Sequence, residues 1–400
     1  MVLALEEFCA RAEAWLEANR DRRPPARELV WGEGSDDVSV FRNLTAEEER
    51  RHIESVRVWQ QQKMDAGYGS IGWPAEYGGA GLSRAYEHAF RSLESGFDTP
   101  AGHEAVSITL ELVGPTILTA GDDEQKRRYL PRLRRTDDMW CQLFSEPGAG
   151  SDLASLTTKA ERHGDHWQLD GQKVWTSGAQ YADFGYIICR TDPVAPRHAG
   201  LTAFLIPMDA PGVEVRPLRQ MSGGSSFNEV FLTGVIVPDE NRLGPVGGGW
   251  QVAVTTLGFE RAASVSTGPA GEDLFARMVM AARQRGRNGD PVVRQALAAV
   301  YAHDRVRTMT RRRVARSAGG VPGPEGSIGK LAWTEGLRRK SDAISTILGP
   351  ALVADTGEWG TYAWSEFVCG APGYRIAGGS DEVQRNIIAE RVLGLPKEPK

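Results

Sequence analysis

The residue pair most able to do chemistry is Glu260 with Arg261, which stand together in the otherwise apolar segment LGFERAAS. A carboxylate inside an apolar pocket is partly desolvated, so its pKa rises and it can take up a proton near neutral pH. A glutamate in such a setting is chemically able to serve as a general base. The alternative is that Glu260 only pairs with Arg261 on a solvated helix face, and the apolar neighbours favour the first interpretation.

A second candidate is the run SEPGAGSD at residues 145–152. Its small residues Gly148, Ala149 and Gly150 would let backbone N–H groups approach a bound group closely. A run rich in Gly and Pro is also typical of a tight turn that binds nothing, so this run alone does not identify a binding site.

The composition is typical of a globular chain and argues against a membrane-spanning or nucleic-acid-binding protein. The 400 residues are 41% hydrophobic and carry a formal net charge of −5. No apolar run approaches the ~20 residues that a spanning helix needs, and the basic runs are separated by acids. The four cysteines form no CxxC pair, so no metal site or disulfide framework is predicted and a cytoplasmic location is expected. The N-terminus lacks the basic region of a signal peptide, so we expect mature protein there.

Helical periodicity dominates both ends of the sequence. In the first ~135 residues, apolar side chains recur every three or four positions, as one face of a helix requires. Thr45 and Glu48 are spaced as a capping box, which predicts the start of a helix. Similar spacing returns after Trp250 and continues to about Leu393.

Between the helical regions lie β-rich runs such as FGYIICR and LTAFLIP, separated by Gly, Asp and Pro. Hairpin turns are expected at Gly164–Asp165 and at Asp170–Gly171, because glycine readily takes the positive φ of tight turns. No GxGxxG follows a strand, which argues against a nicotinamide-binding fold. The order of helices, strands and helices predicts an α+β fold with domains at residues 1–138, 139–247 and 248–400.

Three segments together resemble the acyl-CoA dehydrogenase family: CQLFSEPGAGSDLASLTTKA, DGQKVWTSGAQYAD and GGSDEVQRNIIAERVLGLP. The resemblance extends over nearly the whole chain, and the order and separation of the motifs make it specific. It implies an N-terminal helical domain, a middle β-barrel-like domain and a C-terminal helical bundle. The implied cofactor is FAD. The implied reaction removes the α-proton of an acyl-CoA thioester and transfers a β-hydride to flavin N5, giving the trans-2-enoyl-CoA.

The resemblance also implies which residues hold FAD. The segment from Gln142 to Ser151 would lie along the flavin, where small residues let N–H donors approach the negative charge of the flavin and pyrophosphate. Trp175 would pack against the flavin and Ser177 would donate a hydroxyl hydrogen bond. The implied set is Gln142, Phe144, Ser145, Gly150, Ser151, Trp175 and Ser177, with Ser380 and Glu382 covering the flavin and with Arg285 and Gln295 reaching the ADP half of FAD in a neighbouring subunit.

The sequence departs from the family pattern at the catalytic base. Many members carry a glutamate at the position of Gly378, which can offer a backbone N–H to the thioester carbonyl but cannot accept a proton. In some relatives the base precedes an Arg on a central helix, and Glu260 matches that position. Asp381 is a weaker alternative. Arg261 would lie near the CoA phosphates, where a guanidinium can bind anionic oxygens, or would form an ordinary ion pair.

The resemblance implies partners as well. An electron-transferring flavoprotein would reoxidise the enzyme, and an oligomer, dimer or tetramer, is expected. An acyl-CoA oxidase is an alternative. So is a non-catalytic subunit of a hetero-oligomer, because Gly378 and the segment TILGPAL, with Thr346 and Pro350 at unusual positions, depart from the family pattern.

Overall fold

Packing divides the chain into two units. The computed structural model describes residues 3–25, 28–266, 274–317 and 323–397, and leaves the side chains of residues 261–266 and 314–317 undescribed. The first unit comprises residues 1–26, 44–218 and 226–256, and the second comprises residues 27–43, 219–225 and 257–400.

The first unit begins with short helices. They are α1 (Leu5–Asn19), α2 (Ala46–Asp65), α3 (Arg84–Glu94), α4 (Glu104–Ser107), α5 (Gly114–Ala120) and α6 (Asp123–Arg135), with the π-helical segment η2 (Ile108–Val113) between α4 and α5. The predicted capping box is confirmed: Thr45 accepts a hydrogen bond from the Glu48 backbone, and the Glu48 side chain accepts one from Thr45. These helices bury apolar faces that include Leu16, Trp59 and Phe90.

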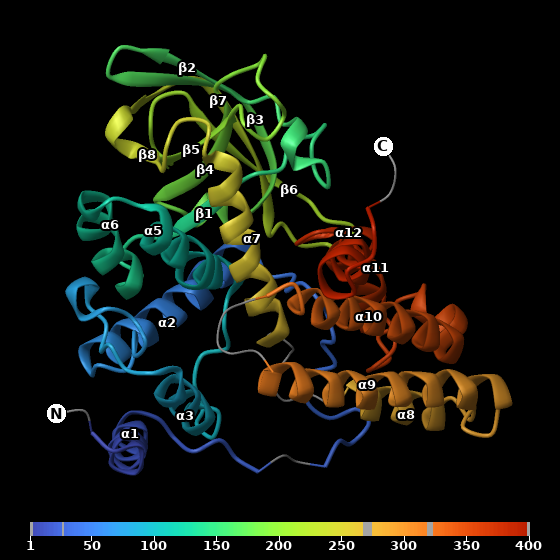
Figure 1. The fold of residues 1–400 in the computed structure, drawn as a ribbon. Coiled ribbons are helices and arrows are strands. Elements are labelled where there is room, and N and C mark those ends of the chain that lie inside the picture. Colours follow the sequence, from blue (N-terminus) through green and yellow to red (C-terminus); the bar gives the residue numbers. More distant parts are fainter. Residues whose placement is uncertain (1–2, 26–27, 267–273, 318–322, 398–400) are drawn as a thin grey trace. The chain divides into compact units, whose positions relative to one another are not determined.

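The rest of the first unit is a sheet of eight strands (Figure 1). They are β1 (Trp140–Leu143), β2 (Lys159–His163), β3 (His166–Ser177), β4 (Phe184–Arg190), β5 (Leu201–Pro207), β6 (Val213–Leu218), β7 (Phe227–Pro238) and β8 (Arg242–Leu243). The order is β6-β7-β3-β2-β4-β5-β8, and β1 pairs in parallel with β4. The buried side chains of alternate residues, including Trp167, Ile187 and Phe204, form its core.

Of the two predicted hairpin turns, one is confirmed and one is wrong. Gly164 has a φ of +66° between β2 and β3, where His163 pairs with His166. Asp170–Gly171 instead lies inside β3, where the pairing register with β7 shifts. A Cβ on Gly171 would lie 2.5 Å from the Thr158 hydroxyl oxygen. The glycine therefore permits a close approach of two segments at a bulge, a second reason for glycine in a strand.

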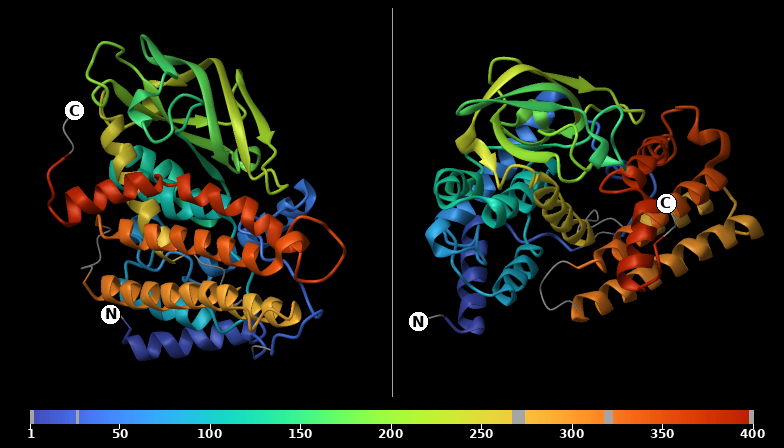
Figure 2. Two further views of the ribbon diagram at one scale, coloured as in Figure 1. Left: turned by 90° about the vertical axis from the view of Figure 1, so that its right-hand side faces the viewer. Right: turned by 45° about the horizontal axis from the view of Figure 1, so that its top comes forward.

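The second unit is helical. Its helices are α8 (Leu274–Gln284), α9 (Pro291–Ser317), α10 (Gly326–Leu348), α11 (Ala363–Ile376), α12 (Asp381–Ile387) and the C-terminal part of α7 (Gly249–Ser266), with η7 (Ile388–Val392) after α12. Helices α9 and α10, in orange, lie side by side in Figures 1 and 2. Buried Met278, Ile344, Trp364 and Phe367 belong to the shared core.

The predicted α+β class is confirmed, since helices precede and follow a single block of strands. None of the helices in the described part of the chain is long and apolar enough to cross a membrane.

Candidate active site

The segment after β1 folds into a tight, partly exposed loop. The Glu146 backbone N–H donates to the Ala149 carbonyl at 2.9 Å, and the Ala149 N–H donates back to the Glu146 carbonyl at 3.0 Å. Gly148, Gly150 and Ser151 lie on the exposed side. A Cβ on either glycine would meet nothing within 4 Å. The loop therefore presents bare backbone to open space, which suits the approach of a large ligand.

A buried ion pair holds this loop to strand β3. The Lys173 ammonium donates to Glu146 Oε1 at 2.9 Å and to the Phe144 carbonyl at 3.0 Å. The two side chains are 0% and 4% exposed. The Glu146 carboxylate also accepts from the backbone of Thr157 and of Thr158, at 2.6 and 2.9 Å. Burial opposes its charge, but the Lys173 charge and these hydrogen bonds outweigh burial and hold the pKa of Glu146 well below its usual range.

Two residues beyond Lys173, the backbone is strained. Trp175 has a φ of +60°, although it is bulky and not glycine, and its side chain is 59% exposed. It lies where the β3–β7 register shifts, between Lys173 and Thr176. A left-handed φ at a bulky residue is a genuine outlier, and bulges near active sites often redirect a side chain. The bulge presents the indole on the outside of the sheet, where it contacts the Phe227 ring edge at a centroid distance of 6.1 Å.

Strand β3 ends at Ser177, which contacts the helical part of the same unit. Its hydroxyl donates to Glu104 Oε1 at 3.1 Å. Desolvation by the surrounding protein raises the pKa of Glu104, although the residue is exposed, and the hydrogen bond from Ser177 opposes the rise. His103 caps the start of α4 by accepting from the Ala105 N–H, so its other ring nitrogen is the one that faces Glu49, at 3.2 Å.

In the second unit, Glu260 meets the glycine turn between α11 and α12. Gly378 has a φ of +63°, and a Cβ built on it would lie 2.7 Å from Glu260 Oε1. The Glu260 carboxylate thus fills the space that a side chain at position 378 would need. The structure brings together these two residues, which stand 118 positions apart in the sequence.

Asp381, the weaker alternative to Glu260, is engaged elsewhere. It is buried, and its two oxygens accept from the Thr334 hydroxyl at 2.6 Å and from Arg375 Nε at 2.8 Å. Ser380 caps α12 by accepting from the Val383 N–H at 3.3 Å. Glu382 is exposed and pairs with Arg385 at 3.3 Å.

The remaining predicted residues lie on other helices of the second unit or outside the description. Arg285 donates to Glu358 at 2.8 Å, so its guanidinium already has an anionic partner. Gln295 is exposed on α9. The side chain of Arg261 lies outside the described residues.

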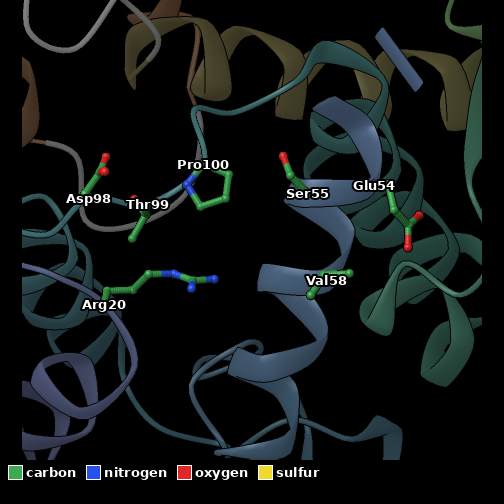
Figure 3. A pocket seen from close by; sticks show the side chains of 7 residues that line it. All are labelled: Arg20, Glu54, Ser55, Val58, Asp98, Thr99 and Pro100. Atoms are coloured by element: carbon green, nitrogen blue, oxygen red, sulfur yellow. The ribbon is translucent and has the colours of Figure 1, made fainter. Parts of the chain in front are cut away.

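A shallow hollow of about 500 Å³ lies among the helices of the first unit (Figure 3). Arg20 projects into it, and α2 forms the opposite wall with Ser55 and Val58. None of the predicted site residues lines it. Metal binding is a separate question from the hollow. Within the described residues, no group of three or more His, Cys, Asp or Glu side chains is placed to hold a metal ion.

Comparison with known proteins explains this arrangement. Family models match in chain order: the N-terminal domain of acyl-CoA dehydrogenase at residues 40–137, the middle domain at 141–235 and the C-terminal domain at 247–393. The chain belongs to the acyl-CoA dehydrogenase family. It is therefore a flavin-dependent enzyme of the class that oxidises CH–CH bonds, and the fold predicted from the motifs is confirmed. The domain boundaries at residues 138 and 247 stay predictions.

Relatives match over the full length. The chain is 38% identical over 405 residues to acyl-CoA dehydrogenase IpdE1 of Mycobacterium tuberculosis, covering 99% of each. A solved structure named Tcur3481-Tcur3483 steroid ACAD has a TM-score of 0.74 and 29% identity, covering 100% of this chain and 99% of that one. The ChsE4-ChsE5 complex from Mycobacterium tuberculosis has a TM-score of 0.69 and 28% identity, covering 100% of each chain.

Members of this acyl-CoA dehydrogenase family bind FAD, and the middle domain fits such a group. The loop of Gly148 and Gly150 leaves open space, and Trp175 exposes its ring in a strained conformation. Beside it, the buried Thr176 hydroxyl and Asn228 side-chain oxygen have no hydrogen-bond partner among the described residues. Buried polar groups without partners are rare and often mark a ligand or water that completes them.

Sequence reasoning missed the buried pair of Glu146 and Lys173, which connects the loop of residues 145–151 to strand β3. A signal was available, because both residues are charged inside otherwise small or apolar motifs, SEPGAG and QKVW. It also missed Glu104, for which no sequence pattern gave a signal.

Proposed function

We propose that this chain is a FAD-dependent acyl-CoA dehydrogenase in which Glu260 takes the α-proton of the thioester. The observation that carries the proposal is the contact between Glu260 and Gly378. The position at which many family members carry their base is a glycine here, and the space of its side chain is occupied by another carboxylate. A carboxylate is thus retained at the same place in the second unit, although it comes from α7.

The reaction assigns separate tasks to the chain's residues. Gly378 would offer its N–H to the thioester carbonyl, which stabilises the enolate-like charge that develops as the α-proton leaves. Glu260 would accept that proton. FAD, when bound, supplies the acceptor for the hydride from the β carbon.

The middle domain would hold the cofactor. The N–H groups near Gly150 and the hydroxyl of Ser151 would bind the pyrophosphate. Phe144, Ser145 and Trp175 would lie against the flavin ring, and Ser177 would hydrogen-bond to it. Gln142, on β1, completes this set.

Contacts outside the middle domain form the second part of the same proposal. Ser380 and Glu382 would cover the flavin, and Arg261 would bind the CoA phosphates. Arg285 and Gln295 would reach the ADP half in a neighbouring subunit, but Arg285 must then exchange Glu358 for a phosphate. An electron-transferring flavoprotein would accept the electrons.

We infer that the substrate is an acyl-CoA whose acyl group derives from a steroid. The support is a likeness to two solved structures whose names describe a steroid ACAD and a variant of it, which are 29% and 30% identical to this chain. Straight-chain fatty acyl groups are the alternative, since a human mitochondrial protein named short-chain specific acyl-CoA dehydrogenase is 35% identical to this chain over 191 residues.

We also infer that the chain works in an oligomer, with a hetero-oligomer as one form of it. Two solved structures similar to it are named as pairs of different chains, Tcur3481-Tcur3483 and ChsE4-ChsE5. A non-catalytic partner role is the second candidate function, and the contact of Glu260 with Gly378 counts against it.

The test uses the purified full chain. Absorbance near 450 nm measures bound FAD per chain, and anaerobic bleaching measures reduction by CoA thioesters. The panel contains butanoyl-CoA, octanoyl-CoA, isobutanoyl-CoA and 3-oxochol-4-en-24-oyl-CoA. We expect bound FAD and fastest bleaching by the steroid thioester. A colourless chain would support the partner role, and peroxide release at the turnover rate in air would identify an oxidase.

A further inference from the structure

A buried lysine lies beneath the glycine turn that meets Glu260. Lys330, on α10, is 2% exposed, and its ammonium donates to the Gly379 carbonyl at 2.7 Å. Taking an ammonium out of water is costly unless acceptors and opposite charges compensate it. Burial lowers the pKa of Lys330, and the carboxylates of Asp381 and Glu260 oppose that change. The buried ammonium is therefore held in place by a carbonyl acceptor and by nearby carboxylates.

Hydrogen bonds to its two carbonyl groups hold the glycine turn in place. Gly378 and Gly379 both have left-handed φ, +63° and +87°. The Gln384 side-chain amide donates to both of their carbonyls, at 2.9 and 3.1 Å, and Lys330 donates to the second. With both carbonyls bound, the two peptide planes have little freedom to rotate. Their orientation fixes how closely Gly378 approaches Glu260.

Charges around Lys330 come from three other helices. Asp381 and Glu382 are on α12, Arg375 is on α11 and Glu260 is on α7. Arg375 already binds Asp381 at 2.8 Å, so that acid is compensated. Asp381 is the carboxylate that acts most strongly on the Lys330 charge, and Glu260 is the second. The interaction is mutual, so the ammonium in turn favours the ionised form of Glu260.

We propose that Lys330 is a positioning residue for the candidate base: it anchors the Gly378–Gly379 turn against Glu260 and keeps the Glu260 carboxylate ionised, ready to accept a proton. This inference rests on the proposed function, because it assigns a role to Lys330 only if Glu260 is the base. A purely structural lysine would anchor the turn without changing the pH at which the base titrates.

The experiment separates charge from anchoring. Lys330→Gln keeps a hydrogen-bond donor and removes the charge, Lys330→Met removes both, and Lys330→Arg keeps both. The matched control is Lys340→Met, since Lys340 is also buried on α10 but pairs with Asp304 at 2.7 Å. Single-turnover bleaching of FAD is followed from pH 5.5 to 9, with the thioester of the panel that reduces the parent enzyme fastest. Thermal unfolding midpoints report the fold of each variant.

We expect the acidic midpoint of the rate profile to rise by about half a pH unit or more in Lys330→Gln and Lys330→Met, because a cation no longer favours the charged base. Lys330→Arg and Lys340→Met should keep the parent midpoint. If Lys330→Met does not fold, Lys330→Gln alone decides. A folded Lys330→Gln with the parent midpoint overturns the inference.

Failure of the proposed function has a different signature. If Glu260→Gln bleaches at the parent rate, Glu260 is not the base, whatever the Lys330 variants do. If Glu260→Gln is slow while the Lys330 variants keep the parent midpoint, only the role of Lys330 is wrong.

Discussion

The middle β region and the C-terminal helical unit contain the two halves of the proposed chemistry, and they are stabilised in different ways. Around Trp175, a buried ion pair and a strained backbone hold a binding surface, and each part lies close in sequence to a motif. Around Glu260, residues from four helices meet at a turn of two glycines. The first region can be recognised from short motifs, whereas the second exists only through packing between distant segments.

The largest effect should come from the candidate base. Glu260→Gln keeps the size of the side chain but accepts a proton poorly, and a positioned general base typically contributes ~10²–10⁴-fold in rate. We expect FAD bleaching to slow by that factor while FAD content stays unchanged. Asp381→Asn is the comparison, because Asp381 is already bound to Thr334 and Arg375. Equal slowing in both variants would mean that the rates do not identify Glu260, rather than Asp381, as the base.

The buried ion pair between Lys173 and Glu146 should matter most for folding. Lys173→Met leaves Glu146 charged and buried without its partner, and breaking such a pair typically costs about 3–5 kcal/mol. The control is Lys159→Met on the neighbouring strand β2, because Lys159 and its partner Glu161 are both exposed and an exposed ion pair contributes little to stability. Urea unfolding measures both. Similar losses of unfolding free energy in the two variants would show that burial of the Lys173–Glu146 pair does not determine its contribution to stability.

The same pair predicts a pH dependence. The folded pKa of Glu146 lies below that of the unfolded chain, so its contribution is complete above the unfolded value and is lost as the pH falls toward the folded one, about 2. Stability should therefore decline progressively below about pH 5. The urea midpoint of the parent should fall more steeply between about pH 5 and about pH 3 than that of the Glu146→Gln/Lys173→Met double variant. Parallel declines would contradict this assignment.

A smaller effect is expected at the glycine turn. Gly378→Ala introduces both an unfavourable φ and a Cβ 2.7 Å from Glu260 Oε1. Gly357→Ala is the matched control, since its φ of +72° is equally unfavourable but a Cβ there meets nothing within 4 Å. Both should lose about 1–2 kcal/mol from backbone strain. Only Gly378→Ala should also slow FAD bleaching, because it displaces Glu260. A normal bleaching rate in Gly378→Ala would show that the contact with Gly378 does not position Glu260 for the reaction.

The smallest effect should have the opposite sign. Trp175→Gly relieves a left-handed φ at a bulky residue, a strain of about 1–2 kcal/mol that is partly offset by the entropy glycine loses on folding. We expect the FAD-free protein to become slightly more stable while its affinity for FAD falls. Chemical unfolding and a flavin titration measure the two. A Trp175→Gly variant that binds FAD as the parent does would show that the strain serves no binding role.

Much of the fold could be predicted because its signals are local. The capping box at Thr45 and the hairpin at Gly164 depend on neighbouring residues, and both are confirmed. The turn expected at Gly171 is wrong because the local signal for glycine has two physical causes, positive φ and close approach, and sequence does not separate them. The contact of Glu260 with Gly378 could not be derived from spacing at all, since it depends on how α7 meets the turn before α12.

The contact between Glu260 and Gly378 also constrains the order in which substitutions could accumulate. A glutamate cannot be installed at position 378 while Glu260 keeps its present rotamer, because the two side chains would claim the same volume. Any mutational path between the two arrangements must pass through a chain with a carboxylate at neither position, change the rotamer of Glu260 or move the backbone of the turn. The pair Glu260→Gly with Gly378→Glu should accordingly show strong positive epistasis, each change being harmful unless the other is present.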